Sequence, residues 1–128
     1  MLNDDIDYLH DCPLLELRYD LTNSSNRLLT LFLDCNGNIK HENREGRILR
    51  LTVSGVYYFQ YVAWGHVIGY EILDRWSEGV TKQTEAELKK HQDMGFNVPS
   101  LRYTVTFHSG SFFELACEDI TTATIKRS

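Results

Sequence analysis

The feature that most constrains the fold is a strict two-residue alternation near the C-terminal end of the sequence. Between residues 101 and 107, large apolar side chains alternate with polar ones. Ser109-Gly110 then offers a two-residue turn, and the alternation resumes through Phe113, Leu115 and Cys117. Because successive residues of a strand point to opposite faces, this pattern predicts a β-hairpin with one buried face, followed by a third strand up to residue 126.

Strand-like patterns also occur earlier in the chain. Residues 15–21, 28–33 and 48–62 are rich in leucine, β-branched and aromatic side chains, which predicts strands in each stretch. Ser54-Gly55 interrupts the last stretch and predicts a bulge or a sharp bend between two strands. Asn36-Gly37 predicts a tight turn. Residues 70–76 fit either a strand or a short helical turn, because neither period extends far enough to decide.

The sequence predicts one helix, from Glu85 to Met94. Thr84 and Glu87 have the spacing of a capping box, and Gly95 is placed to end the helix. A chain of 128 residues with 42% hydrophobic residues has the size and core-forming content of a single domain.

These elements together predict an α+β fold that is mainly β. We expect an antiparallel sheet, or a half-open barrel or sandwich, of about six or seven strands with one helix near residues 84–94.

Charge and cysteine content exclude several classes of protein. The 18 acidic and 13 basic residues give a net charge of -5, which disfavours nucleic acid and favours a basic protein partner. Cys12, Cys35 and Cys117 are odd in number and form no C-x-x-C pair, so we expect reduced thiols rather than disulfides or a zinc site. The acidic N-terminus is unlike a signal peptide, and no apolar run is long enough to cross a bilayer. These features predict a cytoplasmic protein without membrane contact.

No motif for catalysis or for metal binding is apparent in the sequence. The histidines show no i, i+4 spacing of a helical metal site, although distant residues can converge in a fold; they are His10, His41, His66, His91 and His108. Cys117 lies in phase with Phe113 and Leu115 and is therefore expected to be buried. The adjacent acidic residues would raise the pKa of its thiol, which opposes activation as a nucleophile. We therefore expect a protein that is not an enzyme and has neither a metal nor another cofactor.

Two sets of residues are candidates for binding a partner. Acidic side chains before the first strand suit a cationic protein, and a tryptophan suits the centre of an interface. This set comprises Asp4, Asp5, Asp7, Asp11, Trp64 and Trp76. The alternative is a small-ligand pocket, in a binding domain or an enzyme, lined by Tyr57, Tyr61, Trp64 and His66.

Three features of the chain carry a resemblance to a known class of proteins. They are the acidic lead-in at 4–11, the Gly55-Val56 step inside an aromatic strand, and the closing patterns 109–111 and 114–117. With the order of the elements, they resemble small bacterial α+β immunity proteins encoded beside polymorphic or contact-dependent toxins. The resemblance implies a non-enzymatic protein that binds a basic toxin domain and covers its active site or another essential surface. It assigns no role to any individual residue.

Overall fold

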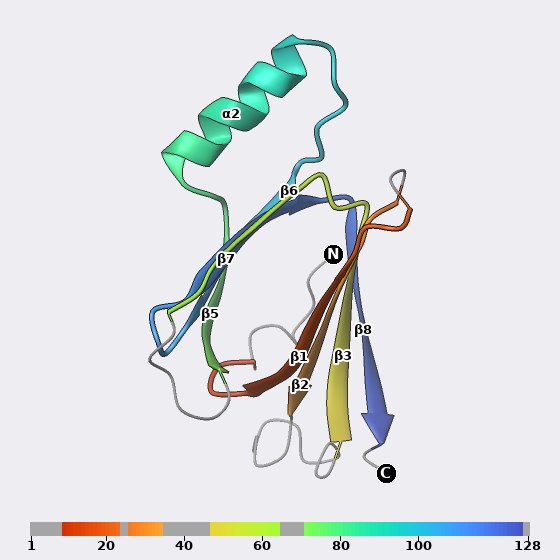
Figure 1. The fold of residues 1–128 in the computed structure, drawn as a ribbon, viewed down its shortest axis with the longest axis vertical. Coiled ribbons are helices and arrows are strands. Elements are labelled where there is room, and N and C mark those ends of the chain that lie inside the picture. The colour runs from red at the N-terminus through yellow and green to blue at the C-terminus, as the bar shows by residue number, and fades with distance from the viewer. Residues whose placement is uncertain (1–8, 24–25, 35–46, 65–70, 127–128) are drawn as a thin grey trace.

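The computed structural model describes residues 9–23, 26–34, 47–64 and 71–126. Within these ranges the chain forms eight strands and one helix (Figure 1). In chain order they are β1 (Pro13–Asp20), β2 (Leu28–Asp34), β3 (Arg47–Ser54), β4 (Tyr58–Val62), β5 (Glu71–Glu78), α2 (Lys82–Asp93), β6 (Leu101–Phe107), β7 (Phe112–Cys117) and β8 (Asp119–Lys126). The predicted Asn36-Gly37 turn lies outside the described residues, and the ambiguous stretch is a strand from residue 71 onward.

The strands form one antiparallel sheet in the order β4-β7-β6-β5-β1-β2-β3-β8, which does not close into a barrel. This arrangement confirms the predicted fold class, with eight strands in place of about six or seven. The sheet is continuous across its middle through two residue pairs between β1 and β5, Pro13 with Ile72 and Leu14 with Glu71. It therefore has a β4 half (β4, β7, β6 and β5) and a β8 half (β1, β2, β3 and β8), which face each other in Figure 1.

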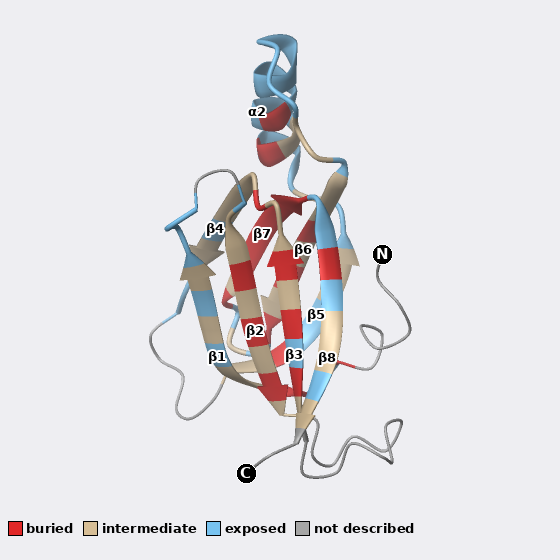
Figure 2. Cartoon of the chain, turned by 90° about the vertical axis from the view of Figure 1, so that its right-hand side faces the viewer, coloured by how far each residue is buried: buried red, intermediate tan, exposed pale blue. Residues whose placement is uncertain are grey.

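The hydrophobic core lies between the two halves of the sheet. Alternate residues of β2 and β3 are buried, as the red bands on these strands show in Figure 2. Because side chains of a strand alternate between faces, each strand contributes every second residue to the core. The core side chains with no exposure to solvent include Leu29, Leu31, Leu33, Leu49, Leu51, Val53, Val105, Phe113, Leu115 and Cys117.

The chain crosses between the two halves at two adjacent places. After β3, Gly55 adopts a φ of +60°, a left-handed conformation that glycine accepts without a Cβ clash, and the chain turns into β4. After β7, Glu118 donates its backbone N–H to the carbonyl of Ser54 at 3.1 Å, which ties the second crossing to the first. The bend predicted at Ser54-Gly55 is thus confirmed.

The β6–β7 hairpin is confirmed in place and in phase. Phe113, Leu115 and Cys117 are buried as predicted. The turn differs in length: Phe107 donates its N–H to the carbonyl of Ser111 at 2.9 Å, so the loop comprises residues 108–110 rather than two residues. Gly110, with a φ of +94°, supplies the left-handed residue that such a loop needs. The predicted third strand is β8, which lies in the β8 half and pairs there with β3.

The start of the helix corrects the sequence-based prediction. Thr81 caps the helix, which begins at Lys82, three residues before the predicted start. Thr84, the predicted cap, lies inside the first turn, where its buried hydroxyl donates to a carboxyl oxygen of Glu114 on β7 at 2.6 Å. A tertiary contact of Thr84 thus replaces the capping role that its sequence context indicated.

The end of the helix is where the sequence places it. Gly95 has a φ of +96° and donates to the carbonyl of Gln92, while Phe96 donates to the carbonyl of His91. These two bonds form a Schellman motif, which satisfies carbonyls at the helix end. Since α2 joins β5 to β6, it lies at the opposite end of the β4 half from the β6–β7 turn (Figure 1).

Candidate functional site

A tight turn before β1 presents two polar side chains to solvent. Leu9 and Cys12 are buried, and Cys12 donates its N–H to the carbonyl of Leu9 at 3.0 Å. Between them, His10 and Asp11 are exposed, and Asp11 has a φ of +67°. Aspartate tolerates this left-handed conformation better than most residues. The two buried residues therefore fix the turn and leave His10 and Asp11 at the surface.

Strand β5 holds this turn and the β6–β7 turn side by side. Asp11 donates its N–H to the carbonyl of Leu73 at 2.8 Å, and His108 donates its N–H to the carbonyl of Ile72 at 2.9 Å. The register of β5 shifts between Leu73 and Arg75, so Asp74 lies at an irregularity of the strand, and its side chain is exposed. Neighbouring residues of β5 thereby anchor both turns.

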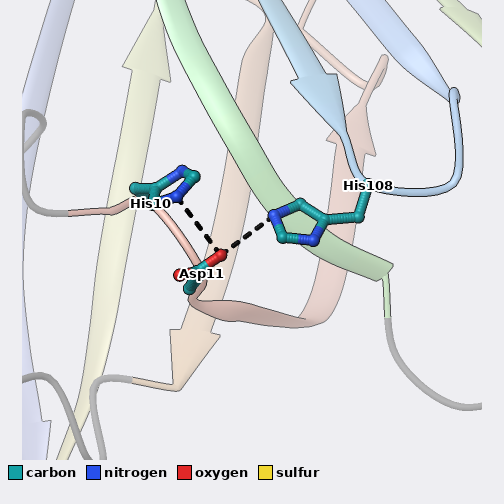
Figure 3. A group of neighbouring side chains, drawn as sticks. All are labelled: His10, Asp11 and His108. Atoms are coloured by element: carbon teal, nitrogen blue, oxygen red, sulfur yellow. Dashed lines mark ion pairs between the residues drawn. The ribbon is translucent and has the colours of Figure 1, made fainter.

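Four side chains converge at this point, and we call them the His–Asp cluster: His10, Asp11, Asp74 and His108. Asp11 Oδ1 lies 3.0 Å from His108 Nε2 and 3.4 Å from His10 Nε2 (Figure 3). Asp74 Oδ1 lies 3.8 Å from His108 Nε2 and 3.8 Å from His10 Nδ1. One carboxylate oxygen of Asp11 thus lies between two imidazole rings that come from distant parts of the chain.

The backbone orients the ring of His10. Its Nδ1 lies 2.6 Å from the carbonyl oxygen of Asp74. A carbonyl can only accept, so Nδ1 carries the hydrogen and Nε2 is directed toward Asp11. This hydrogen bond raises the pKa of His10, and the nearby carboxylates of Asp11 and Asp74 add to the effect. Because the pairs are exposed to water, they contribute little to the stability of the fold.

Trp64 contacts the β6–β7 turn as well. Its backbone N–H donates to the hydroxyl of Ser111 at 2.9 Å. Its ring lies beside Gly110, so close that a Cβ atom added at Gly110 would be 3.6 Å from the ring. The side chain remains 55% exposed. Trp64 and Asp11, two of the residues that the sequence nominated for partner binding, therefore contact the same turn. We call Trp64, the β6–β7 turn, Asp11 and Asp74 the turn surface.

The other nominated residues lie elsewhere. Trp76 is directed into the core, where its ring packs 5.9 Å from Tyr103 and 6.1 Å from Phe113. It is therefore not an exposed anchor. Asp4, Asp5 and Asp7 lie outside the described residues.

The residues nominated for the alternative aromatic pocket have different partners within the part of the chain that the structure describes. Tyr61 stacks on Phe113 in the core, whereas Tyr57 is hydrogen-bonded to His91 of α2, with 2.7 Å between its hydroxyl and Nδ1. Trp64 lies at the β6–β7 turn, and His66 is outside the described ranges.

A different pocket, of about 300 Å³, lies between α2 and β4. Its lining residues are Tyr58, Gln60, Val62, Thr81, Gln83, Thr84, Glu87, Phe112 and Glu114. The buried carboxyl group of Glu114 accepts from the backbone N–H of Thr81 at 2.7 Å and from the hydroxyl of Thr84. Both of its oxygens therefore serve to attach the helix to β7.

Sequence reasoning did not identify the His–Asp cluster as a unit. His10 and His108 lie near opposite ends of the chain, and Asp74 is placed by a strand irregularity. The only local signal was the pair His10-Asp11 between the apolar residues Leu9 and Cys12, which is too common a pattern to indicate a site.

Cys117 has the environment expected of an inert thiol. Burial, assisted by the nearby carboxylate of Asp119, raises the pKa of the Cys117 thiol to about 12. At mildly alkaline pH it therefore stays protonated, and thiolate-specific reagents should not modify it.

In a Cys35→Ser variant, we expect Cys12 and Cys117, both buried, to react with Ellman's reagent only after denaturation. Rapid modification of the native protein would contradict this expectation.

Comparison with protein-family models and with curated proteins yields no match for this chain. Among the described residues, the one helix is too short and too polar to cross a membrane.

Proposed function

We propose that this chain is a non-enzymatic cytoplasmic protein that binds a basic protein partner through the turn surface. As a member of a toxin–immunity pair, it would cover the active site or another essential surface of a bacterial toxin. The observation that carries the proposal is that Trp64 and Asp11 contact the same turn, which combines an exposed indole with nearby carboxylates.

The chemistry of this surface suits a cationic protein. Tryptophan is enriched at the centres of interfaces because its large ring buries much area at a small entropic cost. The carboxylates of Asp11 and Asp74 would attract lysine or arginine side chains, and the net charge of -5 would accelerate the encounter. The same charge disfavours nucleic acid as the partner.

The test is salt-dependent binding kinetics with the product of a toxin-like open reading frame beside this gene. Trp64→Ala should speed dissociation by at least about tenfold, because it removes a contact expected at the centre of the interface. An Asp11→Asn, Asp74→Asn double variant should mainly slow association and flatten its dependence on salt. A chelator in every sample keeps the measurement independent of metal ions.

Matched controls lie at the other end of the β4 half. Phe96 is also exposed, at 53%, and it follows α2; Glu78 is an exposed acidic residue at the end of β5. Phe96→Ala and Glu78→Gln should leave both rates unchanged. Equal effects of Trp64→Ala and Phe96→Ala would exclude the turn surface, and co-purification of a small molecule without any protein partner would overturn the proposal.

A further inference from the structure

We propose that the His–Asp cluster binds one divalent transition-metal ion of the zinc type. The ligand atoms are His10 Nε2, Asp11 Oδ1 and His108 Nε2, while Asp74 lies beside them, with its Oδ1 3.8 Å from His108 Nε2. This inference replaces the sequence-based expectation of no metal. It goes beyond the proposed function, because it requires no protein partner.

The donor set selects the class of ion. Two imidazole nitrogens with one or two carboxylate oxygens suit zinc, cobalt, nickel, copper or iron. Calcium and magnesium prefer ligand sets made only of oxygen, so the two histidines disfavour them.

The spacing of the atoms fits coordination. Bonds of about 2.0–2.1 Å from zinc to nitrogen and oxygen place tetrahedral ligands roughly 3.3 Å apart. Asp11 Oδ1 lies 3.0 Å from one imidazole nitrogen and 3.4 Å from the other. All three ligand atoms lie within 4.8 Å of one another, so small side-chain rotations would bring them around one ion.

The hydrogen bonding of His10 follows the pattern of a metal ligand. Histidine ligands commonly donate their second ring N–H to a carbonyl or carboxylate, which fixes the nitrogen that faces the metal. His10 does this through Nδ1 and the carbonyl of Asp74. The backbone N–H groups of Asp11 and His108 both donate hydrogen bonds to carbonyls of β5, so this one strand positions both ligands.

The position of the cluster indicates what the ion would do. His10 and Asp11 lie in the turn before β1, whereas Asp74 lies on β5 and His108 in the β6–β7 turn, both in the β4 half. Among the residues that the structure describes, the two halves of the sheet pair through two residue pairs of β1 and β5. A bound ion would therefore cross-link the halves beside their narrowest connection and stabilise the folded protein by mass action.

The experiment is titration of the metal-free 128-residue chain with Zn²⁺ by calorimetry. We expect a single ion per chain. A His10→Ala, His108→Ala double variant should weaken binding by more than about 100-fold, beyond the loss typical of an outer-shell change. Asp11→Asn should weaken it by roughly tenfold or more while preserving the backbone, because asparagine also accepts the left-handed conformation. His91→Ala is the matched control, since His91 is an exposed histidine of α2, and this variant should bind as the wild type does.

Two further measurements locate the ion. Co²⁺ should give a visible absorption band that is absent in the double variant, and Zn²⁺ should shift the ring resonances of His10 and His108 but not those of His91. Zn²⁺ should also raise the thermal unfolding midpoint of the wild type and leave that of the folded double variant unchanged. Undiminished binding by the double variant, or no binding by the wild type, would overturn the metal site without affecting the proposed protein partner, which is tested with chelator present.

Discussion

Replacing Phe113 with alanine should lower the free energy of unfolding by about 3–5 kcal/mol. Phe113 is fully buried, and its ring packs against those of Phe59, Tyr61, Trp76 and Phe107. Truncation therefore removes buried apolar area and leaves a cavity that the neighbouring rings cannot fill without changing their geometry. Urea denaturation of wild type and variant measures the difference.

The adjacent Phe112 provides a matched control for this prediction. It points to the opposite face of β7 and is only partly buried, so Phe112→Ala should cost no more than about 1–2 kcal/mol. Equal losses at the two positions would mean that the phase of β7 is wrong.

Replacing Glu114 with alanine should cost about 2–4 kcal/mol, although the residue is polar. Its two oxygens accept from the backbone N–H of Thr81 and the hydroxyl of Thr84, and its side chain is buried beneath the start of α2. Without the carboxyl group, both donors lose their acceptor, and that of Thr84 is the hydroxyl of a buried side chain. In this variant, the amide hydrogens of α2 should therefore gain more in exchange rate over the wild type than the amide hydrogens of β2 and β3 do.

The partners of Glu114 make this prediction specific. Thr84→Val keeps the shape of the side chain but removes the hydroxyl, so its effect should be smaller once Glu114 is already alanine. Glu78→Ala, at an exposed position of β5, should change stability by less than about 0.5 kcal/mol. Additive effects of Thr84→Val and Glu114→Ala would show that the two side chains do not interact.

The sequence predicted those parts of the fold that depend on local pattern. The alternation at 101–107 and 113–117 predicted both the strands and the face that each strand buries, because a strand with one buried face has a period of two. Gly55 and Gly95 marked a bend and a helix end, because both adopt backbone angles that glycine accepts most readily.

The remaining features depend on contacts between distant segments. The helix begins earlier than predicted, and Thr84 bonds to Glu114, a partner thirty residues away, instead of capping the helix. The adjacency of β8 and β3 and the convergence of His10 with His108 follow from strand order, which alternation does not encode. The inward position of Trp76 likewise depends on which sheet half covers it.

The pairing of β3 with β8 has a consequence for how the protein folds during synthesis. All eight residues of β3, from Arg47 to Ser54, pair with residues 119–126. Until residues 119–126 have left the ribosome, the outer edge of β3 lacks its neighbour and exposes unpaired backbone groups, a state prone to strand exchange with other nascent chains. We therefore expect formation of the β8 half to wait for the synthesis of residues 119–126, and a chaperone that shields strand edges to raise the yield of folded protein.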